Sequence, residues 1–366
     1  MLCPRTSSLT SFDAGSAPAA AAVAVPLSEV NSGEHGAAMA SALERAYGSE
    51  GLGILLVRDV PDLAAKRQGL LPLARAFANL KEEVKAKYED GESHFSFGWS
   101  HGKEKLSNGA FDTFKGSFYN NPLENRPCDD AELMKQHPSY LRPNVWPTDD
   151  LPALEPAFMD LGTCIVNVGR ELLRHCDAYV RARRKGGDVA SIERTVADSR
   201  CHKARLLYYF PMSADDAAGK EQDAWCGWHT DHGSLTGLVS ARFTNADGAE
   251  VANPVPDAGL YIRNRAGEVV RVVIPPDCIA FQIGESAQVA SGGLLRATPH
   301  CVSPGTTPAI GVDRSTFAVF MQPSYDAIMD VPKGDEESVR ADIGSRWTPG
   351  CSFGEFTTRT LEANYG

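Results

Sequence analysis

The sequence lacks the features that would place it in a membrane, on nucleic acid or in an oxidising compartment. It has no run of about 18 apolar residues, the length that a spanning helix needs. Acidic side chains outnumber basic ones, 47 to 36, and the net charge is −11, whereas a phosphate backbone requires a basic partner. The nine cysteines include no Cys-x-x-Cys pair, which favours reduced thiols over a disulfide framework or a zinc knuckle. We therefore expect a cytoplasmic monomer that binds a small molecule, with no nucleic-acid or membrane partner.

The composition changes along the chain in a way that predicts its organisation. Residues 1–22 are rich in Ser and Ala and are predicted to be a disordered tail, with a short plastid-type transit segment as the alternative. We expect one domain over residues 23–366. It has an N-terminal helical part at 23–200, a β core at 201–325 and a C-terminal extension at 326–366, and no internal repeat is apparent.

The apolar periodicity predicts long helices first and many strands later. Helical spacing covers residues 34–47, 62–80 and 152–184, and a buried strand is expected at 53–57. From about residue 203 the period becomes that of strands, expected at 205–210, 234–243, 260–264, 269–274, 278–283 and 315–320. The fold class is therefore mainly β with flanking helices (α+β), a sandwich or jelly roll with helices packed outside.

A His-x-Asp triplet, His229-Thr230-Asp231, lies at the centre of the stretch Trp225–Thr236. In an extended strand His229 and Asp231 point to one face and Thr230 to the other. An imidazole and a carboxylate on one face are two thirds of the 2-His-1-carboxylate set that binds non-haem Fe(II) and leaves coordination positions open. The triplet alone is weak, because ordinary surface polarity produces many such triplets.

Five segments that carry polar chemistry follow one another in the β region: Arg205–Tyr209, His229–Asp231, Phe281–Glu285 with Ser291–Gly293, His300, and Asp313–Thr316. In this order they resemble the isopenicillin N synthase-like branch of the 2-oxoglutarate- and Fe(II)-dependent dioxygenases, over about residues 24–325. The stretches Leu-Leu-Tyr-Tyr-Phe, Gly-Trp-His-Thr-Asp-His-Gly-Ser-Leu-Thr and Phe-Gln-Ile-Gly-Glu also resemble a plant and algal subgroup with poorly defined substrates.

The resemblance implies a double-stranded β-helix (jelly-roll) core with His229, Asp231 and His300 as the iron ligands. Arg314 offers a planar cationic fork for the far carboxylate of 2-oxoglutarate, and Thr316 lies two residues on, on the same strand face. The resemblance adds a hydrogen bond from the phenol of Tyr209. Taken singly, each residue has an ordinary alternative: a turn histidine at 300, a surface ion pair at 314, a core tyrosine at 209.

The expected activity is hydroxylation or desaturation of a small metabolite, with O2 and 2-oxoglutarate consumed and succinate and CO2 released. Ascorbate is a candidate reductant. Two alternatives stay open: an isopenicillin N synthase-like Fe(II) oxidase that does not use 2-oxoglutarate, and a jelly roll that binds a ligand without turnover. The chain departs from the family pattern in a long gap between Asp231 and His300, expected to form an external hairpin near residues 245–257, and in Leu207, where the family often has Asn.

The substrate pocket is expected near an aromatic-rich region, residues 91–122. The candidate pocket residues are Phe95, Trp99, His101, Tyr119, Trp228, Gln282 and Phe320. The aromatic residues could instead pack a sheet onto helices. Lys103, Lys105 and Lys115 are either solvated surface lysines or the sign of an anionic substrate. His232, three residues after His229, is expected to face away from the metal ligands.

Overall fold

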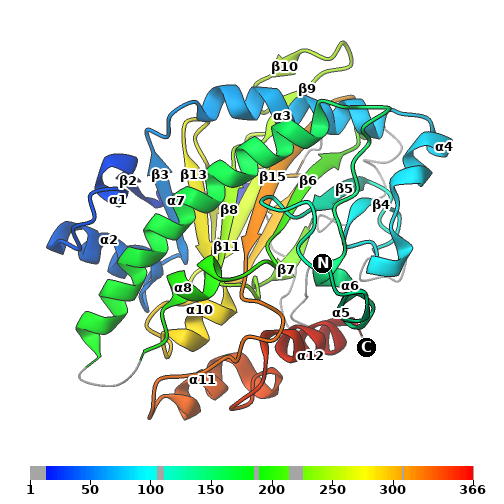
Figure 1. The fold of residues 1–366 in the computed structure, drawn as a ribbon. Helices are drawn as coiled ribbons and strands as arrows, with labels where there is room; N and C mark the ends of the chain where they lie inside the picture. The colour runs from blue at the N-terminus through cyan, green and yellow to red at the C-terminus, as the bar shows by residue number, and fades with distance from the viewer. Residues whose placement is uncertain (1–13, 105–110, 185–188, 214–225, 307–308, 366) are drawn as a thin grey trace.

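The larger of two β-sheets organises the molecule (Figure 1), which is known from a computed structural model describing residues 14–104, 111–184, 189–213, 226–306 and 309–365. Among these residues the larger sheet has ten strands, and its main path runs β2-β3-β13-β8-β15-β6-β5-β4. The strands of this path are, in chain order, β2 Val23–Pro26, β3 Ile54–Arg58, β4 Gly98–His101, β5 Lys115–Asn120, β6 Lys203–Tyr209, β8 Leu235–Val239, β13 Ile279–Ile283 and β15 Asp313–Met321. Strands β9 (Arg242–Thr244) and β10 (Glu250–Val251) form a hairpin that joins the sheet through β15.

The smaller sheet, in the described part of the chain, has five strands in the order β1-β12-β11-β14-β7. Their bounds are β1 Ala19–Ala20, β7 Cys226–His229, β11 Gly259–Arg263, β12 Val269–Val272 and β14 His300–Ser303. Apart from the β11–β12 hairpin, neighbouring strands of this sheet come from distant parts of the chain, so long crossovers link the two sheets. This arrangement confirms the predicted jelly-roll core with flanking helices.

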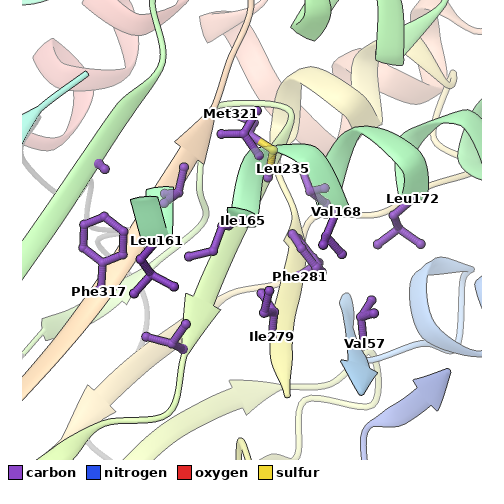
Figure 2. Close-up of a cluster of buried hydrophobic side chains, with 14 of the residues drawn as sticks. Val57, Leu161, Ile165, Val168, Leu172, Leu235, Ile279, Phe281, Phe317 and Met321 are labelled. Atoms are coloured by element: carbon purple, nitrogen blue, oxygen red, sulfur yellow. The ribbon is translucent and has the colours of Figure 1, made fainter. Parts of the chain in front are cut away.

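A long helix, α7 (Leu154–Arg183), lies beside α3 (Leu63–Ala78) across one face of the larger sheet (Figure 1). Its apolar side chains recur three or four residues apart, so they form one stripe that faces the strands. Figure 2 shows this stripe against β3, β8, β13 and β15, with the labelled contacts Val57, Leu161, Ile165, Val168, Leu172, Leu235, Ile279, Phe281, Phe317 and Met321. The helix approaches β8 so closely that a Cβ at Gly237 would collide with Ile165. This packed layer makes the sheet a rigid platform for the side chains on its opposite face.

Shorter helices close the edges and the C-terminal end. They are α1 Leu27–Val30, α2 Ala37–Tyr47, α4 Glu82–Lys85, α5 Ala131–Gln136, α6 Pro138–Leu141, α8 Ile192–Ala197, α10 Glu285–Ala290, α11 Glu336–Ile343 and α12 Phe353–Tyr365. A 3₁₀ turn at Gly344–Arg346 follows α11, and the buried Trp347 and Phe353 pack this C-terminal extension into a small core of its own. No helix among the described residues is long and apolar enough to span a membrane.

The structure corrects two local expectations. Residues 14–22 fall within the predicted disordered tail, but in them β1 pairs in parallel with β12. Residues 1–13 of that tail lie outside the described part. The strand expected at 234–243 breaks after Val239 into β8 and β9. The hairpin expected near 245–257 is present as β9 and β10.

Candidate active site

The two histidines of the predicted ligand set lie directly opposite each other on neighbouring strands. His229 ends β7, His300 begins β14, and the two are register partners in an antiparallel pair. Asp231 follows two residues after His229 and turns to the same side. Its carboxylate oxygens lie 3.8 Å from Nε2 of His229 and 3.9 Å from Nε2 of His300. The three ligand atoms lie within 4.8 Å of one another, so one ion can bind all three.

The backbone orients both imidazoles for metal binding. Nδ1 of His229 lies 2.7 Å from the carbonyl oxygen of Gly227, and Nδ1 of His300 lies 3.1 Å from that of Thr298. A carbonyl only accepts, so each Nδ1 donates, and each Nε2 is the ring nitrogen that faces the other ligands and can bind a metal when it carries no proton. Oδ2 of Asp231 is buried and accepts no hydrogen bond from the described residues. A buried carboxylate oxygen without a donor is costly, and a bound cation removes that cost.

The protonation of the two histidines differs. Burial, and then the charge of His229, lower the pKa of His300, which favours the neutral form that a metal requires. Burial also opposes a charge on His229, but the nearby Cys226 sulfur and Asp231 outweigh it and raise the pKa of His229 to about 9. A metal ion at this site must therefore displace a proton from His229.

The residues expected to hold 2-oxoglutarate lie on two paired strands of the larger sheet. Arg314 on β15 and Tyr209 on β6 are register partners, and the guanidinium carbon lies 4.7 Å from the centre of the phenol ring. Burial raises the pKa of Tyr209, which keeps the phenol protonated as a donor. Thr316 lies two residues from Arg314 on the same face, and its hydroxyl donates to the carbonyl oxygen of Val239 at 3.1 Å. That hydroxyl must turn away from Val239 to donate to a carboxylate.

One cavity of about 420 Å³ contains both groups of residues. Its wall includes the three predicted metal ligands together with Tyr209, Arg314 and Thr316, and also the predicted pocket residues Gln282 and Phe320. The volume lies within the range of small-molecule sites, roughly 300–1,000 Å³. The buried Oε1 of Gln282 has no hydrogen-bond partner among the described residues. The amide is therefore available to a ligand in the cavity.

Three of the aromatic residues expected in the pocket lie outside the described cavity wall. Trp99 is buried against Phe77, with ring centres 5.1 Å apart. Trp228 precedes His229 and therefore faces the other side of β7, where the Arg263 guanidinium lies 4.9 Å from its ring. Phe95 lies under the ammonium of Lys103, 4.7 Å away. These three side chains contact other parts of the protein, so the role of pocket residues stays a prediction for them.

His101 and Tyr119 also lie outside the described cavity wall. Nε2 of His101 binds the carbonyl of Thr113 at 2.9 Å, and the hydroxyl of Tyr119 donates to Glu104 at 3.3 Å. His232, expected to face away from the ligands, is buried on the outer side of the triplet, and burial lowers its pKa to about 4.

A buried charge cluster beside the cavity was not foreseen from the sequence. Arg205 lines the cavity, donates to Oε1 of Glu104 at 2.7 Å and, through Nε, to Ser117 at 2.9 Å. Lys115 lies 3.0 Å from the other carboxylate oxygen of Glu104 and 3.1 Å from Asp112. Lys115 is thus neither a solvated lysine nor part of the described cavity wall, and Lys105 lies outside the described residues. Arg205 could have been found in the sequence, since it precedes Tyr209 by four residues on the same strand face.

Solved structures with this fold are iron- and 2-oxoglutarate-dependent enzymes. The chain superposes on a putative 2OG-Fe(II) oxygenase family protein from Caulobacter crescentus with a TM-score of 0.69 and 21% identity, over 94% of this chain and 99% of that one. It matches a full-length Neurospora crassa protein solved in complex with alpha-KG with a TM-score of 0.65 and 19% identity, over 93% and 96%. JOX2 in complex with 2OG, Fe and JA gives a TM-score of 0.61 at 15% identity, over 100% and 93%. The chain therefore has the fold of the 2OG-Fe(II) oxygenases.

Curated relatives come from the same class. A rice (Oryza sativa subsp. japonica) protein named homoarginine-6-hydroxylase 2-ODD-233 is 30% identical over 145 residues, 40% of this chain and 39% of the relative. A soybean (Glycine max) homoarginine-6-hydroxylase, 2-ODD-C23, is 25% identical over 223 residues, 61% and 60%. The matched segments thus span between about two fifths and three fifths of these relatives, and no protein-family model matches the chain. The resemblance inferred from the motifs is confirmed in its class: both the relatives and the structural neighbours are 2-oxoglutarate-dependent oxygenases.

Proposed function

We propose that this chain is an Fe(II)- and 2-oxoglutarate-dependent oxygenase that oxidises a small molecule. The observation that carries the proposal is the presence, in one cavity, of the His229–Asp231–His300 set and the Arg314–Tyr209 pair. A metal that uses one face of its coordination sphere for three protein ligands keeps the opposite face for a bidentate 2-oxo acid and O2. An arginine in the same buried space matches the second carboxylate of that acid.

Each protein group has a defined part in this proposal. His229, Asp231 and His300 hold the metal, with their imidazoles fixed by the carbonyls of Gly227 and Thr298. Arg314 and Tyr209 bind and orient 2-oxoglutarate, with Thr316 beside them. Bound Fe(II) supplies the activation of O2 coupled to the conversion of 2-oxoglutarate to succinate and CO2. The residues of the proposed metal and 2-oxoglutarate sites are buried, which limits access of water to the reacting groups.

The residues in the cavity wall also suggest which class of substrate the protein binds. Beyond the groups assigned to 2-oxoglutarate, the wall includes two further buried cations among the described residues, Arg67 and Arg205. It also includes the carboxamide of Gln282, with Phe320 as an apolar wall. A molecule with a carboxylate and a short apolar chain complements these groups. The curated relatives are named for homoarginine, an amino acid with these parts. We therefore place free amino acids, homoarginine first, at the head of the candidate substrates. The proposal includes a monomer in the cytoplasm or plastid, without nucleic-acid or membrane partners.

The test is succinate formation by the purified full chain with Fe(II), 2-oxoglutarate, O2 and an amino-acid panel, with and without ascorbate. We expect succinate in a molar ratio to oxidised substrate near one, and its loss in His300→Ala. His101→Ala is the matched control, because it removes an imidazole that lies outside the described cavity wall. Substrate oxidation without succinate would favour the oxidase alternative. A chain whose metal content is unaffected by His300→Ala would refute the assigned metal site and favour the non-catalytic alternative.

A further inference from the structure

The segment Phe281–Glu285, a motif whose purpose the proposed function does not explain, lies directly behind the metal ligands. Gln282 faces the cavity, but after Ile283 the chain leaves β13 and meets the turn that follows Asp231. The backbone N–H of Glu285 donates to the carbonyl oxygen of Asp231 at 2.8 Å. A Cβ at Gly284 would collide with the carbonyl of Gly233, so only glycine allows this approach.

The side chain of Glu285 reaches the residue between two of the ligands. Thr230 lies outside the described cavity wall, and its hydroxyl donates to Oε1 of Glu285 at 2.8 Å. Glu285 is 3% exposed. A buried carboxylate is stable only with strong partners, and the threonine hydroxyl alone does not meet that need.

The C-terminal extension supplies the remaining partner. Arg346, in the 3₁₀ turn after α11, donates through Nη1 to Oε2 of Glu285 at 2.8 Å and through Nη2 to Oε1 at 2.7 Å. This is the bidentate geometry that makes arginine–carboxylate pairs strong and directional. His232, the next outward side chain, stacks on Phe353 of α12 with ring centres 5.9 Å apart. The outer side of the metal-binding segment therefore rests on the C-terminal extension at both Thr230 and His232.

We propose that Glu285, held by Arg346, is a positioning residue that fixes Thr230 and thereby the relative placement of His229 and Asp231. The inference rests on the proposed metal site and extends it to the C-terminal extension. Glu285 holds the segment twice, by its backbone N–H on the carbonyl of Asp231 and by its carboxylate on Thr230. Groups that orient metal ligands in this way typically change metal affinity by about 10- to 100-fold when they are removed.

The experiment measures Co(II) binding to the metal-free full chain by titration, with the visible spectrum of the bound ion as a second readout. Glu285→Gln keeps the size of the side chain and the backbone hydrogen bond to Asp231, but removes the charge that Arg346 binds. We expect Co(II) affinity to fall by about 10- to 100-fold and the spectrum to change. The matched control is Asp342→Asn, since Asp342 of α11 binds Arg296 and Gln288 at 3.0 Å and touches none of the ligands. We expect that control to keep wild-type affinity and spectrum.

Two smaller substitutions keep the test decisive if Glu285→Gln does not fold. Thr230→Val removes only the hydroxyl and leaves the Glu285–Arg346 pair intact, and we expect it to weaken Co(II) binding. Thr230→Ser restores the hydroxyl, and we expect it to recover most of the affinity. In active protein the same variants should lower kcat more than they raise the KM for 2-oxoglutarate, because Arg314 is untouched.

Two results would overturn the inference, and they are distinguishable. Wild-type affinity and spectrum in both Glu285→Gln and Thr230→Val would show that the contact is only structural, with the metal site intact. A wild-type chain that binds no Co(II) would refute the proposed metal site itself, and the positioning role with it.

Discussion

Glu104→Gln should destabilise the folded chain by about 3–5 kcal/mol at pH 7, the cost of removing one partner of a buried ion pair. The carboxylate is 15% exposed and lies between two cations, 2.7 Å from Arg205 and 3.0 Å from Lys115. A hydrogen bond to a charged group contributes about 1.5–3 kcal/mol, and two such bonds are at stake. Glutamine keeps the shape but removes the negative charge that Arg205 and Lys115 share.

The same pair predicts how the destabilisation depends on pH. Burial would raise the pKa of Glu104, but Arg205 and Lys115 outweigh it and hold the pKa well below its ordinary value of 4.5. A carboxylate whose pKa is lower in the folded chain stabilises fully above its unfolded value, and that stabilisation is lost as the pH falls. The difference in the free energy of unfolding between wild type and Glu104→Gln should therefore become smaller below pH 4.5. It should fall by about 1.4 kcal/mol for each pH unit.

The assay is urea unfolding of both proteins at pH 7 and at half-unit steps down to about pH 3.5, a range that spans the unfolded pKa of the carboxyl group. Glu132→Gln is the matched control, because Glu132 binds Lys135 at 2.9 Å with both side chains largely exposed, and such pairs contribute about 1 kcal/mol or less. If Glu104→Gln lowers the free energy of unfolding no more than Glu132→Gln does, the assignment of a strong buried pair is refuted. If the decrease in Glu104→Gln is the same at every pH, the lowered pKa of Glu104 is refuted.

Three further substitutions probe the cosubstrate site, the core and the approach behind the ligands. Arg314→Met should raise the KM for 2-oxoglutarate by about 10- to 100-fold while leaving Co(II) affinity unchanged, since it removes a charge-assisted bidentate pair; an unchanged KM would contradict that role. Phe281→Ala, at a side chain with no exposure in the α7 interface, should lower the free energy of unfolding by about 3–5 kcal/mol in a denaturant titration. Gly284→Ala should move residues 284–285 away from the carbonyl of Gly233 and so lower Co(II) affinity. Wild-type Co(II) affinity in this variant would show that the turn accommodates the added methyl group.

Two residues of the proposed metal-binding set, His229 and Asp231, were predictable because they lie two residues apart in the sequence. In an extended segment, such residues turn their side chains to the same side. His300 needed the order of motifs, because its pairing with His229 is a contact between strands that are far apart in sequence. Arg314 and Tyr209 followed from the same order, and they too are register partners across two strands.

The substrate side was less predictable for a physical reason. An aromatic side chain can line a cavity or pack in a hydrophobic core. Which of the two it does depends on the face of the sheet from which it projects, and the sequence alone does not give that face. The side chains of Trp99 and Trp228 point away from the cavity and pack into buried apolar clusters elsewhere in the protein. Conversely, the role of Glu104 appears only once β5 and β6 pair and bring Lys115 and Arg205 to its two oxygens.

The cross-strand pairing of His229 with His300 has a consequence for the order of events during synthesis and folding. Neither strand can present its imidazole to the other until β7 and β14 have docked in the correct register, and a slip by one residue would turn one histidine to the opposite side of the sheet. A nascent or partly folded chain therefore has no complete ligand set. Metal binding at the proposed site would then stabilise only the chain with the finished register, and added metal should protect from proteolysis only chains that have already folded.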